Sequence, residues 1–290
     1  MEGRNKTIVQ PVRRNLEFNL PKERIGDWHA GGAHITHFFN ALSIFFPDGE
    51  RFFIDSVRHY RGRIQDPELK ESVRGFIGQE AMHGREHEEY NQALVDKGLP
   101  ADRYGRIVVR LLGFFTRFTP KISQLAGTIA LEHLTAILAN MVLSEPRILK
   151  NAEPRFAALW KWHALEETEH KAVAYDVFQQ VTGGGLLAYI QRCTALLTAT
   201  FIFWLMVIPF HIGLVRKEGQ ALNLRGWLGV INFLWGSPGV LRRTIPDWLD
   251  YFKPGFHPWD HDNAHFLAGV DALVTEVDAY GAVAGAGAAA

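Results

Sequence analysis

The chain has 290 residues, of which 47% are hydrophobic, so it is long enough to bury a substantial core. Its 31 basic and 31 acidic residues cancel at neutral pH, which argues against a nucleic-acid-binding protein, while 13 histidines favour metal or proton chemistry. The single Cys193 excludes an internal disulfide and a Cys-rich zinc site, and we interpret it as a buried, inert thiol.

Residues 1–30 are polar and contain two prolines, so they predict an extended N-terminal arm. The segment 1–18 is charged and lacks the apolar stretch of a secretory signal. We therefore expect a cytoplasmic protein, with a location peripheral to the inner membrane as the alternative. An apolar helix is predicted over 34–46.

The next helix is predicted over about 48–64, after the break Pro47-Asp48-Gly49. Asp48 is the expected N-cap, and Glu50 falls in the first turn. A third helix is predicted to start at Asp66-Pro67 and to end at Gly98. Its apolar stripe is interrupted by Glu80 and His83, and a core-facing carboxylate is costly unless it is paired or binds a metal.

Two further helices are predicted over 104–118 and from Pro120 to about Ser144. Glu132 is the only acidic residue between Lys121 and Glu145, in a run of apolar and small residues. A charge in such a place indicates a function.

Pro154 is expected to open a helix that runs to the glycines 183–185. Glu167 and His170 lie on the apolar face of this helix. Glu166 is adjacent and competes with Glu167 for the same role. The likeness to the Glu80/His83 pair favours Glu167.

The segment 193–215 contains no charged residue, and the segment 226–241 is also apolar. Two interpretations stay open: a buried hairpin that covers the helical bundle, or a contact of 193–241 with a membrane surface. The region 251–265 is rich in His, Asp and aromatic residues and is interpreted as an ordered loop, with a second metal site as the alternative. The low-complexity tail 281–290 is expected to be disordered.

The two Glu-x-x-His pairs are the strongest feature of the chain. On a helix, residues three apart share a face, so both side chains of a pair can reach one metal ion. Each pair follows a lone Glu on an earlier helix, a pattern typical of a four-helix carboxylate bundle that binds two metals. The predicted ligands are Glu50, Glu80, His83, Glu132, Glu167 and His170.

Three other histidines lie near this pattern. His87 is one turn beyond His83 and is a candidate seventh ligand. His163 is one turn before Glu167 and is a candidate partner that orients a ligand. His133 points to a neighbouring face and is interpreted as structural.

Three stretches, Phe46–Phe53, Gly78–His87 and Trp162–Lys171, resemble a bacterial family of predicted metal-dependent hydrolases. The resemblance extends from about residue 8 to about residue 265. The ligand set resembles the ferritin-like di-iron superfamily, whose members mostly activate O2, and His87 is similar to the additional histidine of its N-oxygenase branch. Ferritins have no counterpart of the apolar region 193–241, so the resemblance does not favour iron storage.

These features predict an all-α protein: the arm 1–30, a ferritin-like four-helix bundle over 31–185, additional apolar C-terminal helices over 186–280, and the tail 281–290. We expect a di-iron enzyme that activates O2 to oxidise an apolar small-molecule substrate. The alternatives are a metal-dependent hydrolase that uses a metal-bound water, and a non-enzymatic iron-handling or membrane-associated protein. The expected cofactors are two metal ions, Fe first and Mn or Zn as alternatives. No nucleic-acid partner is expected, and a homodimer is left open.

Overall fold

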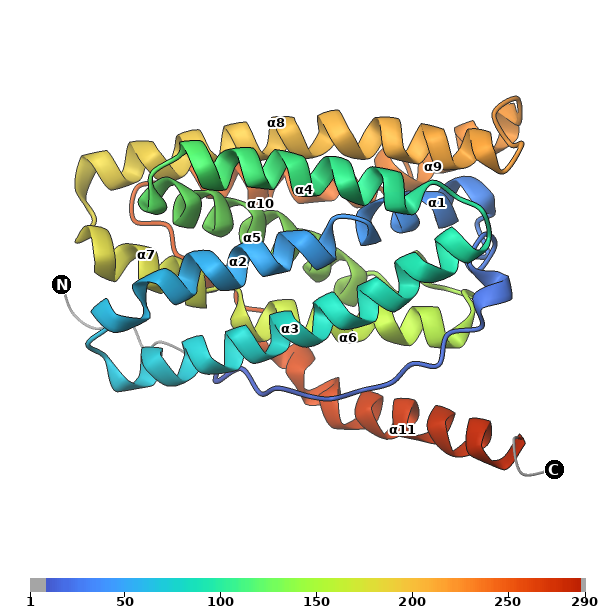
Figure 1. Ribbon diagram of the computed structural model, residues 1–290, viewed down its shortest axis with the longest axis horizontal. Coiled ribbons are helices and arrows are strands. Elements are labelled where there is room, and N and C mark those ends of the chain that lie inside the picture. Colours follow the sequence, from blue (N-terminus) through green and yellow to red (C-terminus); the bar gives the residue numbers. More distant parts are fainter. Residues whose placement is uncertain (1–8, 288–290) are drawn as a thin grey trace.

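The computed structural model describes residues 9–287, and within this range every regular element is helical (Figure 1). The prediction of an all-α protein is therefore confirmed. The α-helices are α1 (Ala33–Ser43), α2 (Phe46–Tyr60), α3 (Pro67–Asp96), α4 (Ala101–Phe118), α5 (Lys121–Ser144), α6 (Pro154–His170), α7 (Val173–Thr182), α8 (Gly185–Lys217), α9 (Leu224–Trp235), α10 (Val240–Asp250) and α11 (Val270–Gly287).

The boundaries of α3 follow the predicted signals. The side chain of Asp66 accepts a hydrogen bond from the backbone N–H of Glu68, and Pro67 occupies the first turn, where a missing N–H costs nothing. At the other end Gly98 adopts a positive φ of 83°, which glycine reaches without a Cβ clash.

The predicted start of α2 is wrong. Pro47 does not separate two helices but lies in the first turn of α2, which begins at Phe46. Asp48 is therefore inside the helix rather than its N-cap. Its carboxylate accepts a hydrogen bond from the guanidinium of Arg51 at 3.2 Å.

The prediction of a single helix from Pro154 to the glycines 183–185 is also wrong, because the helix is interrupted between α6 and α7 at Lys171 and Ala172. The Lys171 side chain is buried and donates to the carbonyl of His261 and to Oδ1 of Asn263, at 2.6 and 2.7 Å. Burial lowers the pKa of Lys171 to about 7. These tertiary contacts explain the break, and the local sequence pattern carries no sign of them.

Four helices enclose the centre of the molecule. Helix α2 packs against α3, and α5 packs against α6, while α2 and α5 also touch each other. Helix α8 lies along α1 and α5 on one side of this group, at the upper edge of Figure 1. By length and composition both α5 and α8 could cross a membrane, but the apolar window of α5 is mostly buried whereas only 17% of that of α8 is buried.

The described part of the arm, residues 9–21, has no regular structure and runs beneath α3 and α6 (dark blue in Figure 1). It lies so close to α3 that a Cβ added at Gly75 would meet the carbonyl oxygen of Pro11 at 2.1 Å. At the other end, α11 extends to Gly287 across most of the tail expected to be disordered, and 288–290 lie outside the described residues. The predicted domain boundaries stay predictions.

Candidate metal centre

The six predicted ligands converge in the interior, from α2, α3, α5 and α6, and all are at most 2% exposed. Their ligand atoms form groups in which all atoms lie within 4.8 Å of one another. The groups are Glu50/His83/His163, Glu80/Glu132/His170 and Glu80/His83/Glu167. Every predicted ligand belongs to at least one group, Glu80 and His83 each belong to two, and His163 is a further member.

Many polar atoms of these side chains have no hydrogen-bond partner. Both carboxylate oxygens of Glu50, Glu80 and Glu132 are buried without a hydrogen-bond partner, as are both ring nitrogens of His83 and Nε2 of His170. Buried unpaired polar atoms are costly, and charged ones more so. Oxygen and imidazole donors in this number fit divalent metal ions, which would satisfy these atoms and offset the charge of the carboxylates.

The electrostatics of the carboxylates reflect their crowding. Burial, together with the negative charge of Glu167 and Glu132, raises the pKa of Glu50 well above its ordinary value. Burial and the neighbouring carboxylates act on Glu80 and Glu132 in the same direction. Burial also opposes ionisation of Glu167, but protons on the adjacent His170 and His163 would pull its pKa well below the ordinary value. The crowded carboxylates therefore favour the binding of cations at this centre.

A chain of hydrogen bonds determines which nitrogen of His163 faces the centre. The amide of Asn91 donates to the backbone carbonyl of Ser43, so its oxygen faces the Ser43 hydroxyl, which donates to it at 3.0 Å. Ser43 must then accept from Nδ1–H of His87 at 2.8 Å. The bare Nε2 of His87 in turn accepts from Nδ1–H of His163 at 2.9 Å. This leaves a lone pair on Nε2 of His163, directed at Oε1 of Glu167.

His170 is oriented by a parallel arrangement. The amide of Gln79 donates to the Glu169 carboxylate, so Oε1 of Gln79 accepts from Nδ1–H of His170 at 3.1 Å. Nε2 of His170 then faces the carboxylates, 3.1 Å from Oε1 of Glu80. Arg14 of the arm holds Glu169 with both terminal nitrogens, at 2.9 and 2.7 Å.

Glu166 and Glu167 differ in their hydrogen-bond partners. Glu167 accepts a hydrogen bond from the Thr135 hydroxyl at 2.6 Å and belongs to one of the groups of metal-binding atoms. Glu166 is in none of these groups among the described residues, and it accepts a hydrogen bond from Arg14 at 3.1 Å. Its second oxygen lies 3.1 Å from Nε2 of His83, and burial raises its pKa to about 7.

The remaining candidates have other partners. Both ring nitrogens of His87 are taken, by Ser43 and His163, and His87 belongs to none of the groups found in the described chain. His133 lies 3.1 Å from the carbonyl of Asp247, outside the centre. In the ordered loop 251–265, His257 pairs with Asp176 and His261 with Asp250, and the groups found within residues 9–287 include no second metal site there.

The sequence analysis missed Gln79, Glu169 and Arg14. Gln79 directly precedes Glu80, and Glu169 directly precedes His170, so polar residues beside a ligand on the buried side of a helix were the available signal. No sequence signal marked Arg14, because only the path of the arm in the folded protein brings this residue to the metal centre.

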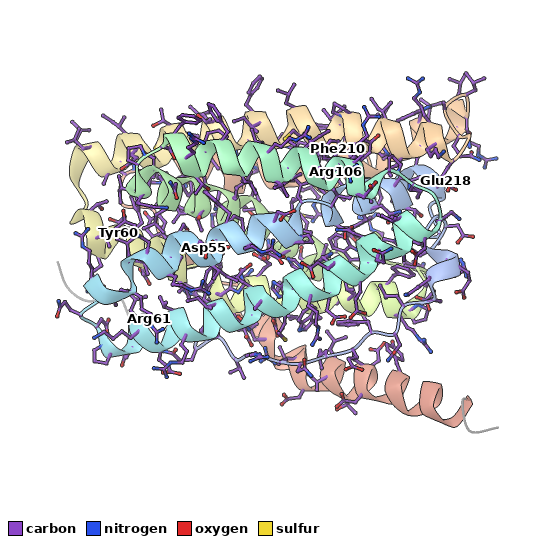
Figure 2. All side chains as sticks on the ribbon, viewed as in Figure 1. Asp55, Tyr60, Arg61, Arg106, Phe210 and Glu218 are labelled. Atoms are coloured by element: carbon purple, nitrogen blue, oxygen red, sulfur yellow. The ribbon has the colours of Figure 1, made fainter. Side chains whose placement is uncertain are left out.

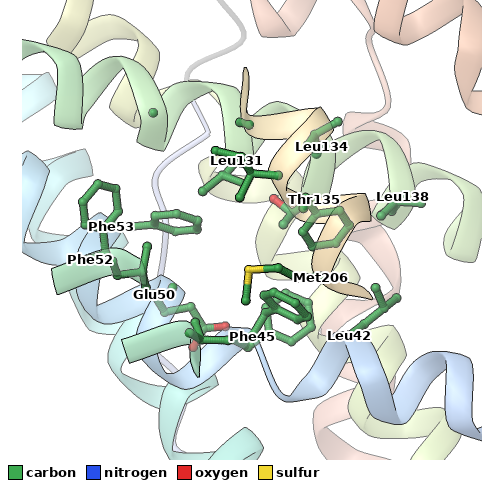
Figure 3. A pocket seen from close by; sticks show the side chains of 18 of the residues that line it. Leu42, Phe45, Glu50, Phe52, Phe53, Leu131, Leu134, Thr135, Leu138 and Met206 are labelled. Atoms are coloured by element: carbon green, nitrogen blue, oxygen red, sulfur yellow. The ribbon is translucent and has the colours of Figure 1, made fainter. Parts of the chain in front are cut away.

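A cavity of about 390 Å³ reaches the centre from α8 (Figure 3). Its wall is almost entirely apolar and includes Phe45, Leu131 and Met206. Glu50, His163 and Glu167 also line it and supply the ionisable groups. The close-up shows Glu50 and Thr135 as the labelled polar side chains among apolar ones.

Comparison with known proteins identifies one family. A family described as predicted metal-dependent hydrolase matches residues 12–262, most of the chain. No curated protein and no solved structure matches the chain. The expectation of an O2-activating di-iron oxidase is therefore corrected, since the matching family is one of hydrolases, which was the alternative. The ferritin-like character of the helical arrangement stays a prediction.

Proposed function

We propose that this chain, which belongs to the family of predicted metal-dependent hydrolases, hydrolyses a carboxylic ester or amide that carries a long apolar group. One observation carries the proposal: Glu50, His163 and Glu167, members of the candidate metal centre, line an otherwise apolar cavity. An apolar chain held by the wall would bring its hydrolysable bond to these residues.

Two divalent ions suit the centre, because the four carboxylates Glu50, Glu80, Glu132 and Glu167 carry the charge that two such ions balance. Glu50, His83 and His163 would hold one ion, Glu80, Glu132 and His170 would hold the other, and Glu167 would supply a further carboxylate. A bound ion would lower the pKa of a coordinated water towards neutrality and polarise the substrate carbonyl, and neither effect requires a redox change.

The chain's own residues would prepare the reaction in two ways. The apolar wall excludes water and fixes the substrate chain, which strengthens every electrostatic interaction at the reacting bond. The hydrogen bonds from Ser43 through His87 to His163, and from Gln79 to His170, hold both imidazoles with Nε2 towards the centre.

The test is hydrolysis of nitrophenyl acetate, hexanoate and dodecanoate by protein reconstituted with Zn²⁺ or Mn²⁺ under anaerobic conditions. We expect metal-dependent turnover without O2, with kcat/KM rising with acyl length. Glu132→Gln should abolish it, and because Glu132 does not line the cavity, that loss would come through the metal. Glu89→Gln, on the exposed side of α3, is the matched control. Turnover that needs no metal, or that survives Glu132→Gln, would overturn the proposal.

A further inference from the structure

Helix α8 exposes a long apolar stripe to solvent. Its exposed side chains recur at helical spacing over about 33 Å. They are Ile190, Leu197, Phe201, Leu205, Ile208 and Ile212, between 38% and 68% exposed. The opposite side of α8 packs on α1 and α5, so the helix lies flat on the protein and does not leave it. In Figure 2 side chains project outward all along this edge.

Helix α4 continues the apolar surface. Val109 and Thr116 of α4 line a second hollow together with α2, and the opposite side of α4 carries the exposed Ile107, Phe114 and Phe118. We call the exposed apolar residues of α4 and α8 the α4–α8 face. The two helices meet where Tyr104 stacks on Phe210, with ring centroids 4.3 Å apart.

The cavity opens within this face. Phe201 and Leu205 belong to the exposed stripe, whereas the residues that follow them, Ile202 and Met206, line the cavity. The exposed Thr198 also lines it, so the cavity reaches the surface beside the stripe. From α4, Leu111 and Phe115 form the facing wall.

The border of the face is basic, although the chain as a whole is neutral. Helix α4 exposes Arg103, Arg106, Arg110 and Arg117 against a single acid, Asp102, which pairs with Arg106. The last turn of α8 adds the exposed Arg216 and Lys217. Figure 2 labels Arg106 and Phe210 at the end where α4 and α8 meet.

We propose that the α4–α8 face docks on a bilayer that contains anionic phospholipid, with the mouth of the cavity opening towards the acyl chains. Apolar side chains bordered by arginines are the composition of helices that lie in a membrane interface. A second copy of this chain fits less well, because a two-fold interface would bring two rows of arginines together. The further step, that an acyl compound enters the cavity from the membrane, rests on the proposed hydrolase function.

Vesicle flotation tests the docking. The full chain should bind vesicles of phosphatidylcholine with phosphatidylglycerol, bind weakly to phosphatidylcholine alone, and lose affinity as salt is added. Exchanging Arg103, Arg106 and Arg110 for Gln should weaken binding about a hundredfold, since each arginine contributes about fivefold. A variant with Lys at the same three positions should retain vesicle binding. Phe201→Ser with Leu205→Ser should abolish binding even at low salt.

The control exchanges Arg24, Arg58 and Arg74 for Gln, because these are exposed arginines on other elements that each pair with a nearby acid. Equal weakening by the two triple variants would overturn the proposal, as would no binding to anionic vesicles. A wild-type dimer that Phe201→Ser with Leu205→Ser converts to a monomer would assign the face to a second copy instead.

Flotation of Glu132→Gln separates the two proposals. This variant should bind vesicles like the wild type while losing hydrolysis, because docking does not use the metal centre. If the protein binds vesicles but hydrolyses no ester, only the proposed hydrolase function is refuted. If the protein hydrolyses esters but does not bind vesicles, only the membrane proposal is refuted.

Discussion

Nε2 of His163 lies 3.0 Å from Oε1 of Glu167, and the hydrogen bonds that start at Asn91 leave that nitrogen without a proton. A lone pair facing a carboxylate oxygen at this distance is repulsive unless a proton or a cation lies with them. His163 is also part of the group with Glu50 and His83. The geometry therefore favours His163 as a metal ligand in its own right, rather than only an orienting partner.

Ser43→Ala tests this chain without altering any residue of the centre. The substitution leaves Nδ1–H of His87 without an acceptor, so the ring of His163 loses its fixed tautomer. We expect metal affinity to fall roughly ten- to a hundredfold, measured by competition with a chelating dye. Ser72→Ala on α3, whose hydroxyl bonds the carbonyl of Glu68, should leave affinity unchanged. An unchanged affinity for Ser43→Ala would remove the orienting role.

Glu132→Gln should separate stability from metal binding. Burial raises the pKa of Glu132, so the metal-free folded state keeps a proton that the unfolded state releases as pH rises. Glu132 therefore costs stability above its ordinary pKa, and the amide removes this cost. At pH 8 we expect the metal-free variant to unfold with a free energy greater by on the order of 2 kcal/mol, by urea denaturation. The same variant should bind fewer metal ions by elemental analysis. A less stable metal-free variant would contradict the buried-charge account.

Arg14→Gln should destabilise the fold through the arm. The Arg14 guanidinium pairs with Glu166 and Glu169, which are buried and would lose their cationic partner. We expect a loss on the order of 3 kcal/mol in the free energy of unfolding, partly recovered by Arg14→Lys. The neighbouring Arg13 is exposed, so Arg13→Gln serves as control. Equal effects of the two glutamine substitutions would show that the ion pairs contribute little.

His37 should make the protein sensitive to acid. Burial and the nearby His211 lower the pKa of His37 to about 3, below its ordinary value of 6.5. Protons therefore bind the unfolded state preferentially, and stability is lost as pH falls from 6.5 towards 3, by about 1.4 kcal/mol per pH unit. His37→Gln should make this slope shallower in denaturation series between pH 8 and pH 5. His59→Gln, at an exposed position of α2, should not. Identical slopes for wild type and His37→Gln would exclude the effect.

The six charged and imidazole side chains that converge were predictable because each conflicts with its surroundings. Glu132 lies in an apolar run, and Glu80 and His83 interrupt an apolar stripe, so their faces and their helices followed from periodicity alone. The start of α3 at Asp66 and its end near Gly98 followed from local backbone chemistry in the same way.

The features that sequence reasoning missed depend on contacts between distant segments. Lys171 ends α6 because residues about ninety positions later bind its side chain, and Arg14 reaches Glu166 from the far end of the chain. No local pattern encodes such contacts. Asp48 was misassigned for a different reason: Pro47 suits both the end of one helix and the first turn of the next, and only tertiary packing decides between them.

The close fit of the arm against Gly75 has a consequence for the order of assembly. The arm touches α3 through Gln79 and α6 through Glu169, so its binding groove does not exist until those two helices are side by side. The segment synthesised before both helices can therefore dock only after the two helices have packed together. Until the arm docks, Glu169 lacks the Arg14 guanidinium, so the hydrogen bonds from Glu169 through Gln79 to His170 lack that support.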